Sequence, residues 1–228
     1  MNDEVFRSSL DESVIPGKRL GRHVVHDPRS RNFPAERAAQ IESVTHQASG
    51  LPLNQGTVGS CTANALCGAL DSSPDFRGGT LRSENDAIQL YGVETRLEGK
   101  PYPPNDPGGS GLEVCKAAKQ LGWITSYTHA FGVEHALLAL VVRPVITGIS
   151  WYTSFDAPGA TGLVAIAPGA TVRGGHEVLA DGIDAANQLV WFWNSWGPTF
   201  GLGGRFCMSF STWEQLLSEQ GDATVPIV

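Results

Sequence analysis

A helix-like segment that begins with a cysteine and a strand-like segment followed by an asparagine lie far apart in this 228-residue chain. Residues 61–70 start with Cys61 and carry Ala and Leu at helical spacing. Residues 189–193 form a β-prone run just before Asn194. His176 lies between them, 115 positions after Cys61 and behind two glycines. If these three side chains act together, the fold must join a helical part to a β-rich part. The 27 glycines and 14 prolines likewise indicate a loop-rich α+β protein and not a helical bundle.

The chemistry that these residue types suggest is acyl transfer. A thiol, an imidazole and an amide that orients the imidazole, with a second amide at Gln55, are the parts of a cysteine-nucleophile site. The thiolate is the nucleophile, and a helix N-terminus favours it. Ser60 is the expected N-cap, which puts Cys61 in the first turn. Gln55 and the backbone N–H of Cys61 are the expected donors to an oxyanion.

The histidine is the expected base. We expect Asn194 to accept a hydrogen bond from Nδ1–H of His176, which fixes the ring without adding negative charge and leaves a thiolate–imidazolium pair plausible. Trp196 is expected to cover that hydrogen bond and to keep water out.

The segments that carry these residues resemble the papain-like cysteine peptidases. The family pattern Gln-Gly-x-x-Gly-Ser-Cys matches residues 55–61, Asn-Ser-Trp-Gly matches residues 194–197, and residues 200–206 resemble a glycine- and aromatic-rich family segment. The Cys-Thr-Ala-x-Ala variant is similar to a short bacterial and phage branch. The resemblance covers roughly residues 21–210, and its motifs are specific only jointly.

The resemblance implies a two-lobed fold, with a helical lobe, an antiparallel β-barrel-like lobe and the active-site cleft between them. We expect a flexible segment at 1–19 and a peptidase domain at 20–228. Its helical lobe would cover about 55–125, and its β-rich lobe about 126–228 plus the N-terminal segment. The first twenty residues could occlude the cleft.

The resemblance also implies residue roles in an endopeptidase. Cys61 would attack the scissile carbonyl, and His176 would protonate the leaving amine. Gly108 and Gly109 resemble a glycine pair whose backbone takes up substrate as an added β-strand, although they could simply turn the chain before a helix. Gly175 and Trp196 complete the expected substrate-binding set.

Three departures from the family pattern stand out. Thr62 follows the nucleophile where an aromatic residue is usual, and Val58 replaces a half-cystine. Glu177 follows the histidine where a small residue is usual. Its carboxylate could alter the pKa of the base or point to solvent.

Composition excludes several other classes of function. The net charge is −7, with 16 basic and 23 acidic residues and no basic patch, so nucleic acid is not an expected partner. Assigning one of the four cysteines to catalysis leaves three. We interpret these three as buried apolar side chains in a reducing compartment. No Cys-x-x-Cys occurs, so no metal site is expected. The chemistry needs no cofactor, and the expected partner is a peptide or protein substrate.

The chain carries no evident targeting signal. Residues 1–5 lack the basic and apolar parts of a signal peptide. The longest apolar stretch, 136–149, contains Arg143 and Pro144 and does not suit a membrane span. We therefore expect a cytoplasmic protein without membrane contact, in the host cytoplasm if it is phage-encoded, and a monomer by default.

Periodicity predicts the remaining elements. Helices are expected at 83–97, 112–121, 134–140 and 211–217, and strands at 145–152, 163–166 and around 178–183. Trp191 and Trp193 are expected in the core. The five histidines other than His176 are expected to be structural or exposed.

Two other classes of function stay open. One is another thiol acyl-transfer enzyme, such as an amidase, a deamidase or a transpeptidase. The other is a non-catalytic binding protein on the same fold, against which the four intact site residues argue.

Overall fold

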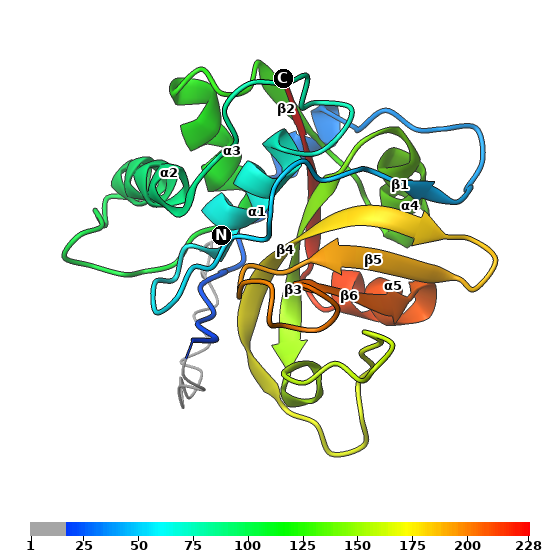
Figure 1. Ribbon diagram of the computed structural model, residues 1–228. Coiled ribbons are helices and arrows are strands. Elements are labelled where there is room, and N and C mark those ends of the chain that lie inside the picture. The colour runs from blue at the N-terminus through cyan, green and yellow to red at the C-terminus, as the bar shows by residue number, and fades with distance from the viewer. Residues whose placement is uncertain (1–16) are drawn as a thin grey trace.

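The computed structural model describes residues 17–228, and in this part of the chain five α-helices accompany an antiparallel sheet (Figure 1). The helices are α1 (Cys61–Leu70), α2 (Glu84–Leu97), α3 (Gly111–Gln120), α4 (Val133–Val142) and α5 (Phe210–Ser218), with 3-10 turns η1 (Pro28–Asn32) and η2 (Thr153–Phe155). The strands are β1 (Val44–Thr45), β2 (Ser126–His129), β3 (Val145–Tyr152), β4 (Val172–Asp184), β5 (Leu189–Trp193), β6 (Arg205–Ser209) and β7 (Asp222–Ile227). The expected α+β class is confirmed.

The sheet is built around its longest strand, β4. The strand order is β2-β7-β3-β4-β5-β6, and the short β1 pairs with β4 as well. Helices α1, α2 and α3 gather on one side of the molecule, with α1 packed against β4 (Figure 1). Because β4 is covered on both faces, residues 176–183 are buried without interruption, which departs from the alternating pattern of a strand with one wet face.

Two apolar cores lie on opposite faces of β3 and β4. Leu179 and Ile146 join the core of α1, α2 and α3. Val178 and Ala180, which alternate with Leu179 along the strand, join the second core with α4 and α5. One central strand therefore fixes the two halves of the molecule relative to each other.

Most expected elements occur close to their predicted bounds. Strands β3 and β5 match them residue for residue, and α2 starts after Ser83, whose side chain forms a capping box with Asp86. Strands β2, β6 and β7 had no prediction. In residues 17–228 no helix is long and apolar enough to cross a membrane.

The predicted strand at 163–166 is wrong. Only a single bridge forms there, between Leu163 and Cys207, and Leu163 is 44 % exposed. Gly162 and Gly169 turn the chain on either side with positive φ, so the segment runs along β6 too briefly for a ladder.

The prediction that Trp191 and Trp193 lie in the core is only partly right. Both are half-buried, while Phe192 between them is fully buried. The Arg205 guanidinium covers the two indoles, 5.1 Å and 5.4 Å from their ring centroids. Strand alternation places the two indoles on the face of β5 opposite Phe192, where Trp193 packs against the core of α1, α2 and α3.

Candidate active site

Cys61 is the first residue of α1 and is fully buried. Ser60 occupies the N-cap position as expected, but its side chain makes no capping bond. Its hydroxyl instead accepts a hydrogen bond from Nδ2 of Asn64 at 3.0 Å. The thiol therefore lies at the positive end of the helix, where the dipole stabilises a thiolate.

His176 on β4 bonds to Asn194, which follows β5. The distance between His176 Nε2 and Asn194 Oδ1 is 2.7 Å. Asn194 Oδ1 also accepts the Ser195 N–H at 2.7 Å, so this atom is the acceptor and Nε2 carries the proton. The expected bond from Nδ1 is therefore wrong. Nδ1 has no hydrogen-bond partner among the described residues, and this nitrogen remains able to take a proton from a thiol.

Two indoles enclose the imidazole. Trp196 stacks on His176 with ring centroids 4.9 Å apart, and Trp151 meets the ring edge-on at the same distance. Trp196 also donates from Nε1 to the Arg19 carbonyl. Trp196 thus lies against the imidazole of the His176–Asn194 pair, as expected. Trp151 was not foreseen, although its place in a predicted strand was a usable signal.

Burial sets the charge state of the pair in this structure. Desolvation lowers the pKa of His176 to about 3, against the Asn194 hydrogen bond. Desolvation also raises the pKa of Cys61 to about 12, although the backbone amides of Glu177 and Gly21 act in the opposite direction. The enclosed pair is therefore a neutral thiol and a neutral imidazole, and the plausible ion pair requires an opened site.

Gln55 is buried beside the same constellation. Its Nε2 donates to the Val58 carbonyl at 2.7 Å, and its Oε1 accepts from the Ser195 hydroxyl. The Gln55 N–H also donates to the Ser195 carbonyl. Ser195 therefore ties the loop of Gln55 to the Asn194 turn, a role that the sequence analysis did not assign.

The expected substrate-binding glycines hold a segment of the chain itself. Gly109 donates to the Gly21 carbonyl and accepts from the His23 N–H, both at 2.8 Å. The Arg22 N–H donates to the Gly175 carbonyl at 3.0 Å. Gly109 and Gly175 thus lie on opposite sides of a single strand-like segment. Figure 1 shows this dark-blue stretch running between the helices and the sheet.

Glycine is required along this contact. Gly108 has φ +80°, and a Cβ there would lie 1.9 Å from the Gly21 carbonyl oxygen. A Cβ on Gly175 would lie 2.2 Å from the Arg22 carbonyl oxygen. Close backbone approach therefore explains these glycines. The expectation that the first twenty residues occlude the cleft falls mainly on residues 1–16, which lie outside the described part, and the segment that contacts Gly109 and Gly175 is residues 21–23.

Glu177 behaves in neither of the expected ways. It is fully buried, so it does not point to solvent. It does not contribute to the pKa shift of His176, which burial, Asn194 and Arg173 account for. Alternation along β4 sends its side chain away from the imidazole.

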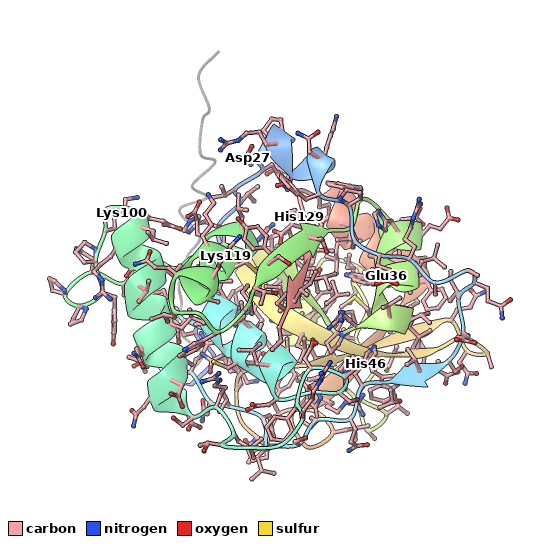
Figure 2. The ribbon with its side chains drawn as sticks, turned by 90° about the horizontal axis from the view of Figure 1, so that it is seen from above. Asp27, Glu36, His46, Lys100, Lys119 and His129 are labelled. Carbon is pink, nitrogen blue, oxygen red and sulfur yellow. The ribbon has the colours of Figure 1, made fainter. Side chains whose placement is uncertain are left out.

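Two other buried histidines, His46 and His129, have structural partners. Nε2 of His46 lies 2.6 Å from the Leu140 carbonyl, and Nδ1 of His129 lies 3.2 Å from the Thr224 hydroxyl. Figure 2 shows them on separate parts of the chain, with His129 on β2. Both are buried, and burial lowers the pKa of each.

One curated protein resembles the chain in sequence, while no protein-family profile matches it. An uncharacterised peptidase C1-like protein of Acanthamoeba polyphaga mimivirus is 27 % identical over 199 residues, which cover 69 % of this chain. The aligned part spans only 64 % of the length of that viral protein.

Solved structures establish the fold. Xylellain, a cysteine protease from Xylella fastidiosa, superposes with a TM-score of 0.74 at 22 % identity and covers 93 % of this chain and 96 % of its own. Digestive procathepsin L 3 of Tenebrio molitor gives 0.63 at 14 % identity, over 86 % and 73 % of the two chains. A Carica candamarcensis cysteine protease in complex with E-64 gives 0.55 at 19 % identity, over 81 % and 97 %. The chain therefore has the fold of papain-like cysteine proteases.

Proposed function

We propose that this chain is a cysteine peptidase of the papain-like type, related to the short bacterial and phage branch that its nucleophile motif resembles. The observation that carries the proposal is the state of His176. Asn194 holds Nε2, indoles enclose the ring, and Nδ1 is left for a thiol at the start of α1.

The proposed mechanism begins with proton transfer from the Cys61 thiol to Nδ1 of His176. The thiolate attacks the scissile carbonyl while the Cys61 N–H and the Gln55 amide stabilise the oxyanion. His176 then gives its proton to the leaving amine. Water releases the acyl group from the thioester, with His176 as the base and Asn194 holding the ring throughout.

The resting state under this proposal is closed. Residues 20–23 fill the backbone positions on Gly109 and Gly175 that a substrate strand would use. Release of this segment would let water reach the thiol and the imidazole, which removes the desolvation that keeps both neutral. Activation is therefore a displacement that requires no new catalytic group.

The path of the segment supports action on internal peptide bonds. The chain continues on both sides of the site. Arg19 meets Trp196 on one side, and His23 contacts Glu98 on the other. A cleft that accepts a continuous strand suits an endopeptidase.

The test is hydrolysis of a peptide library by the full chain, followed by mass spectrometry, together with labelling by an epoxysuccinyl peptide. The wild type and Arg22→Ala, which loosens the closed state, are compared with Cys61→Ala. We expect cleavage and a single adduct that require Cys61, both stronger in Arg22→Ala. Release of ammonia or a new amide bond would instead indicate an amidase or a transpeptidase. If neither the wild type nor Arg22→Ala cleaves a peptide or reacts with the label, the protein is a non-catalytic binding protein.

A further inference from the structure

The Arg22 side chain leaves the cleft and enters a buried pocket. Its side chain is only 2 % exposed. Nη2 donates to a carboxylate oxygen of Asp222 at 2.5 Å and to the Gln220 carbonyl at 2.7 Å. A residue that crosses the candidate active site as backbone therefore places its guanidinium in a specific site.

A second acid lines the same pocket. Glu177 is fully buried, and neither of its carboxylate oxygens accepts a hydrogen bond from residues 17–228. Arg22 Nε likewise has no hydrogen-bond partner within that range. Native proteins rarely leave such groups unsatisfied, so this acid is available to a ligand.

Two glycines provide the space. A Cβ on Gly148 would lie 2.4 Å from Arg22 Nε, 2.6 Å from Asp222 Oδ2 and 2.8 Å from Glu177 Oε2. A Cβ on Gly111 would lie 2.7 Å from Asp222 Oδ1 and 2.8 Å from Glu177 Oε1. Any side chain at either position would fill the volume that the charged groups share.

The sheet register holds the acids in place. Gly148 on β3 pairs with Glu177 on β4 and with Asp222 on β7. The two carboxylates therefore flank one glycine from neighbouring strands, on rigid backbone. Burial raises the pKa of Glu177, the charge of Asp222 adds to this effect, and the Arg22 guanidinium acts in the opposite direction.

The pocket has a defined position relative to the reacting sulfur. The Gly21 amide lies against the Cys61 sulfur, and Arg22 is the next residue. Arg22 is also the residue whose flanking peptide groups pair with Gly109 and whose N–H pairs with Gly175. The pocket therefore receives the side chain second from the bond under attack.

We propose that Glu177 and Asp222, together with Gly111 and Gly148, form a specificity pocket for arginine at the second residue from the cleaved bond of a peptide substrate. Arg22 occupies this pocket in the closed state in place of that residue. This inference rests on the proposed peptidase function and names the substrate class of the same site.

The geometry favours arginine over other side chains. A guanidinium reaches Asp222 and the Gln220 carbonyl with one nitrogen while Nε faces the space beside Glu177. Lysine has a single nitrogen, so an ammonium bound to Asp222 would leave no second donor beside Glu177. An apolar side chain would leave the buried Glu177 and the partly buried Asp222 without a counter-charge.

The kinetic test uses full-length Arg22→Ala and fluorogenic peptides that differ only at the second residue: arginine, citrulline, lysine or leucine. Citrulline keeps the size and planarity of arginine without its charge. We expect kcat/KM for arginine to exceed that for citrulline about 100-fold, because an unpaired buried charge costs several kcal/mol.

Variants of the pocket provide the matched comparison. Glu177→Gln and Asp222→Asn should each reduce the arginine-to-citrulline ratio at least about tenfold. Asp184→Asn, on the same strand as Glu177 but at its exposed end, should leave the ratio unchanged. Because both peptides are measured on the same variant, a lower fraction of folded enzyme cancels in the ratio.

Binding separates failure of the pocket from failure of the catalytic proposal. The double variant Cys61→Ala/Arg22→Ala is titrated with the arginine and citrulline peptides by calorimetry. Selective binding without hydrolysis by Arg22→Ala would support the pocket and overturn the peptidase. Hydrolysis or binding that does not distinguish arginine from citrulline would overturn the pocket and leave the peptidase standing.

Discussion

Two buried glutamates, one in each half of the molecule, differ in a way that burial alone does not reveal. Glu94 lies on α2 and Glu177 on β4, and both are fully buried with pKa values raised well above their ordinary value by desolvation. Glu94 accepts hydrogen bonds from the Thr62 hydroxyl at 2.8 Å and from the Ser110 N–H at 3.0 Å. Glu177 accepts none from residues 17–228.

The number of hydrogen bonds distinguishes Glu94, which has a structural role, from Glu177, which is available to bind a ligand. Glu94 ties α1 to the loop before α3, and it lies so near Gly109 that a Cβ there would be 2.0 Å from its Oε1. The threonine at position 62 supplies one of its two hydrogen-bond donors. A buried carboxylate is therefore interpreted from its partners, since satisfied groups hold the fold and unsatisfied ones await a ligand.

Removal of the structural acid should produce the largest effect. Glu94→Ala leaves the Thr62 hydroxyl and the Ser110 N–H buried without an acceptor, and we expect the free energy of unfolding to fall by about 4 kcal/mol. Urea denaturation measures it. Glu94→Gln, which keeps an acceptor oxygen, is the control and should lose less than half as much. A loss below about 1 kcal/mol for Glu94→Ala would contradict the structural role.

Arg22→Ala should expose the cleft over Cys61 without destabilising the contacts that Glu94 makes. Loss of the pocket contact frees the segment over Cys61, so we expect the thiol to react with iodoacetamide at least about tenfold faster. Intact-mass spectrometry over time measures the rate. Arg29→Ala, which removes an exposed arginine paired with Asp27, is the control. Equal rates in all three chains would show that Arg22 does not hold the segment.

Glu177→Gln should change how stability depends on pH. The pKa of Glu177 is raised on folding above its ordinary value of 4.5, so the folded state binds more protons than the unfolded state above that pH. Wild-type stability therefore falls as pH rises from about 4.5 towards the raised value. Glu177→Gln removes this loss and should gain about 1 kcal/mol or more relative to wild type at pH 8.

The charged groups that face Glu177 are the same in the wild type and in Glu177→Gln. They are Asp222, Arg22 and Glu94, none of which the variant changes. Denaturation at pH 4, 6 and 8 measures the difference. Asp184→Asn, at a carboxyl with a pKa lowered from 3.8, is the control, and its stability difference from wild type should change below about pH 4 and stay constant from pH 6 to 8. A constant difference between Glu177→Gln and wild type would contradict the raised pKa.

Thr62→Val should produce the smallest effect. It removes one of the two hydrogen bonds to Glu94 and should cost about 1 kcal/mol of unfolding free energy. Thermal unfolding followed by circular dichroism measures it. The preference for arginine over citrulline should not change, because the Thr62 hydroxyl donates to Glu94 and not to Glu177 or Asp222. A changed preference would mean that the two acids are coupled.

The sequence predicted the elements that depend on local patterns. The Ala and Leu spacing after Cys61 and the β-branched and aromatic runs of β3 and β5 decide their own structure. The strand at 163–166 failed, because pairing depends on a neighbour that lies 44 residues later, at Cys207. Strand β7 was missed for a similar reason, since its ladder partners come from β2 and β3.

The candidate site was predictable as a set of residues but not as a geometry. Motifs identified Cys61, His176 and Asn194, and the structure holds the last two in contact. Which imidazole nitrogen meets Asn194 depends on the relative placement of β4 and β5, and no motif encodes this. The pocket of Glu177 depends on register between three strands and on a distant arginine.

The position of Arg22 has a consequence for how this protein can evolve. The residues that would select the substrate side chain also bind Arg22 and keep the cleft covered. One pair of acids would therefore determine both the specificity of the enzyme and its inhibition by its own segment. A mutation at Asp222 that broadens the substrate specificity would also weaken the binding of Arg22. The cleft would then open, and the enzyme would be active without a signal. Lineages that change their preferred side chain should therefore change position 22 in step, and the identity of that residue would record the preference of its own enzyme.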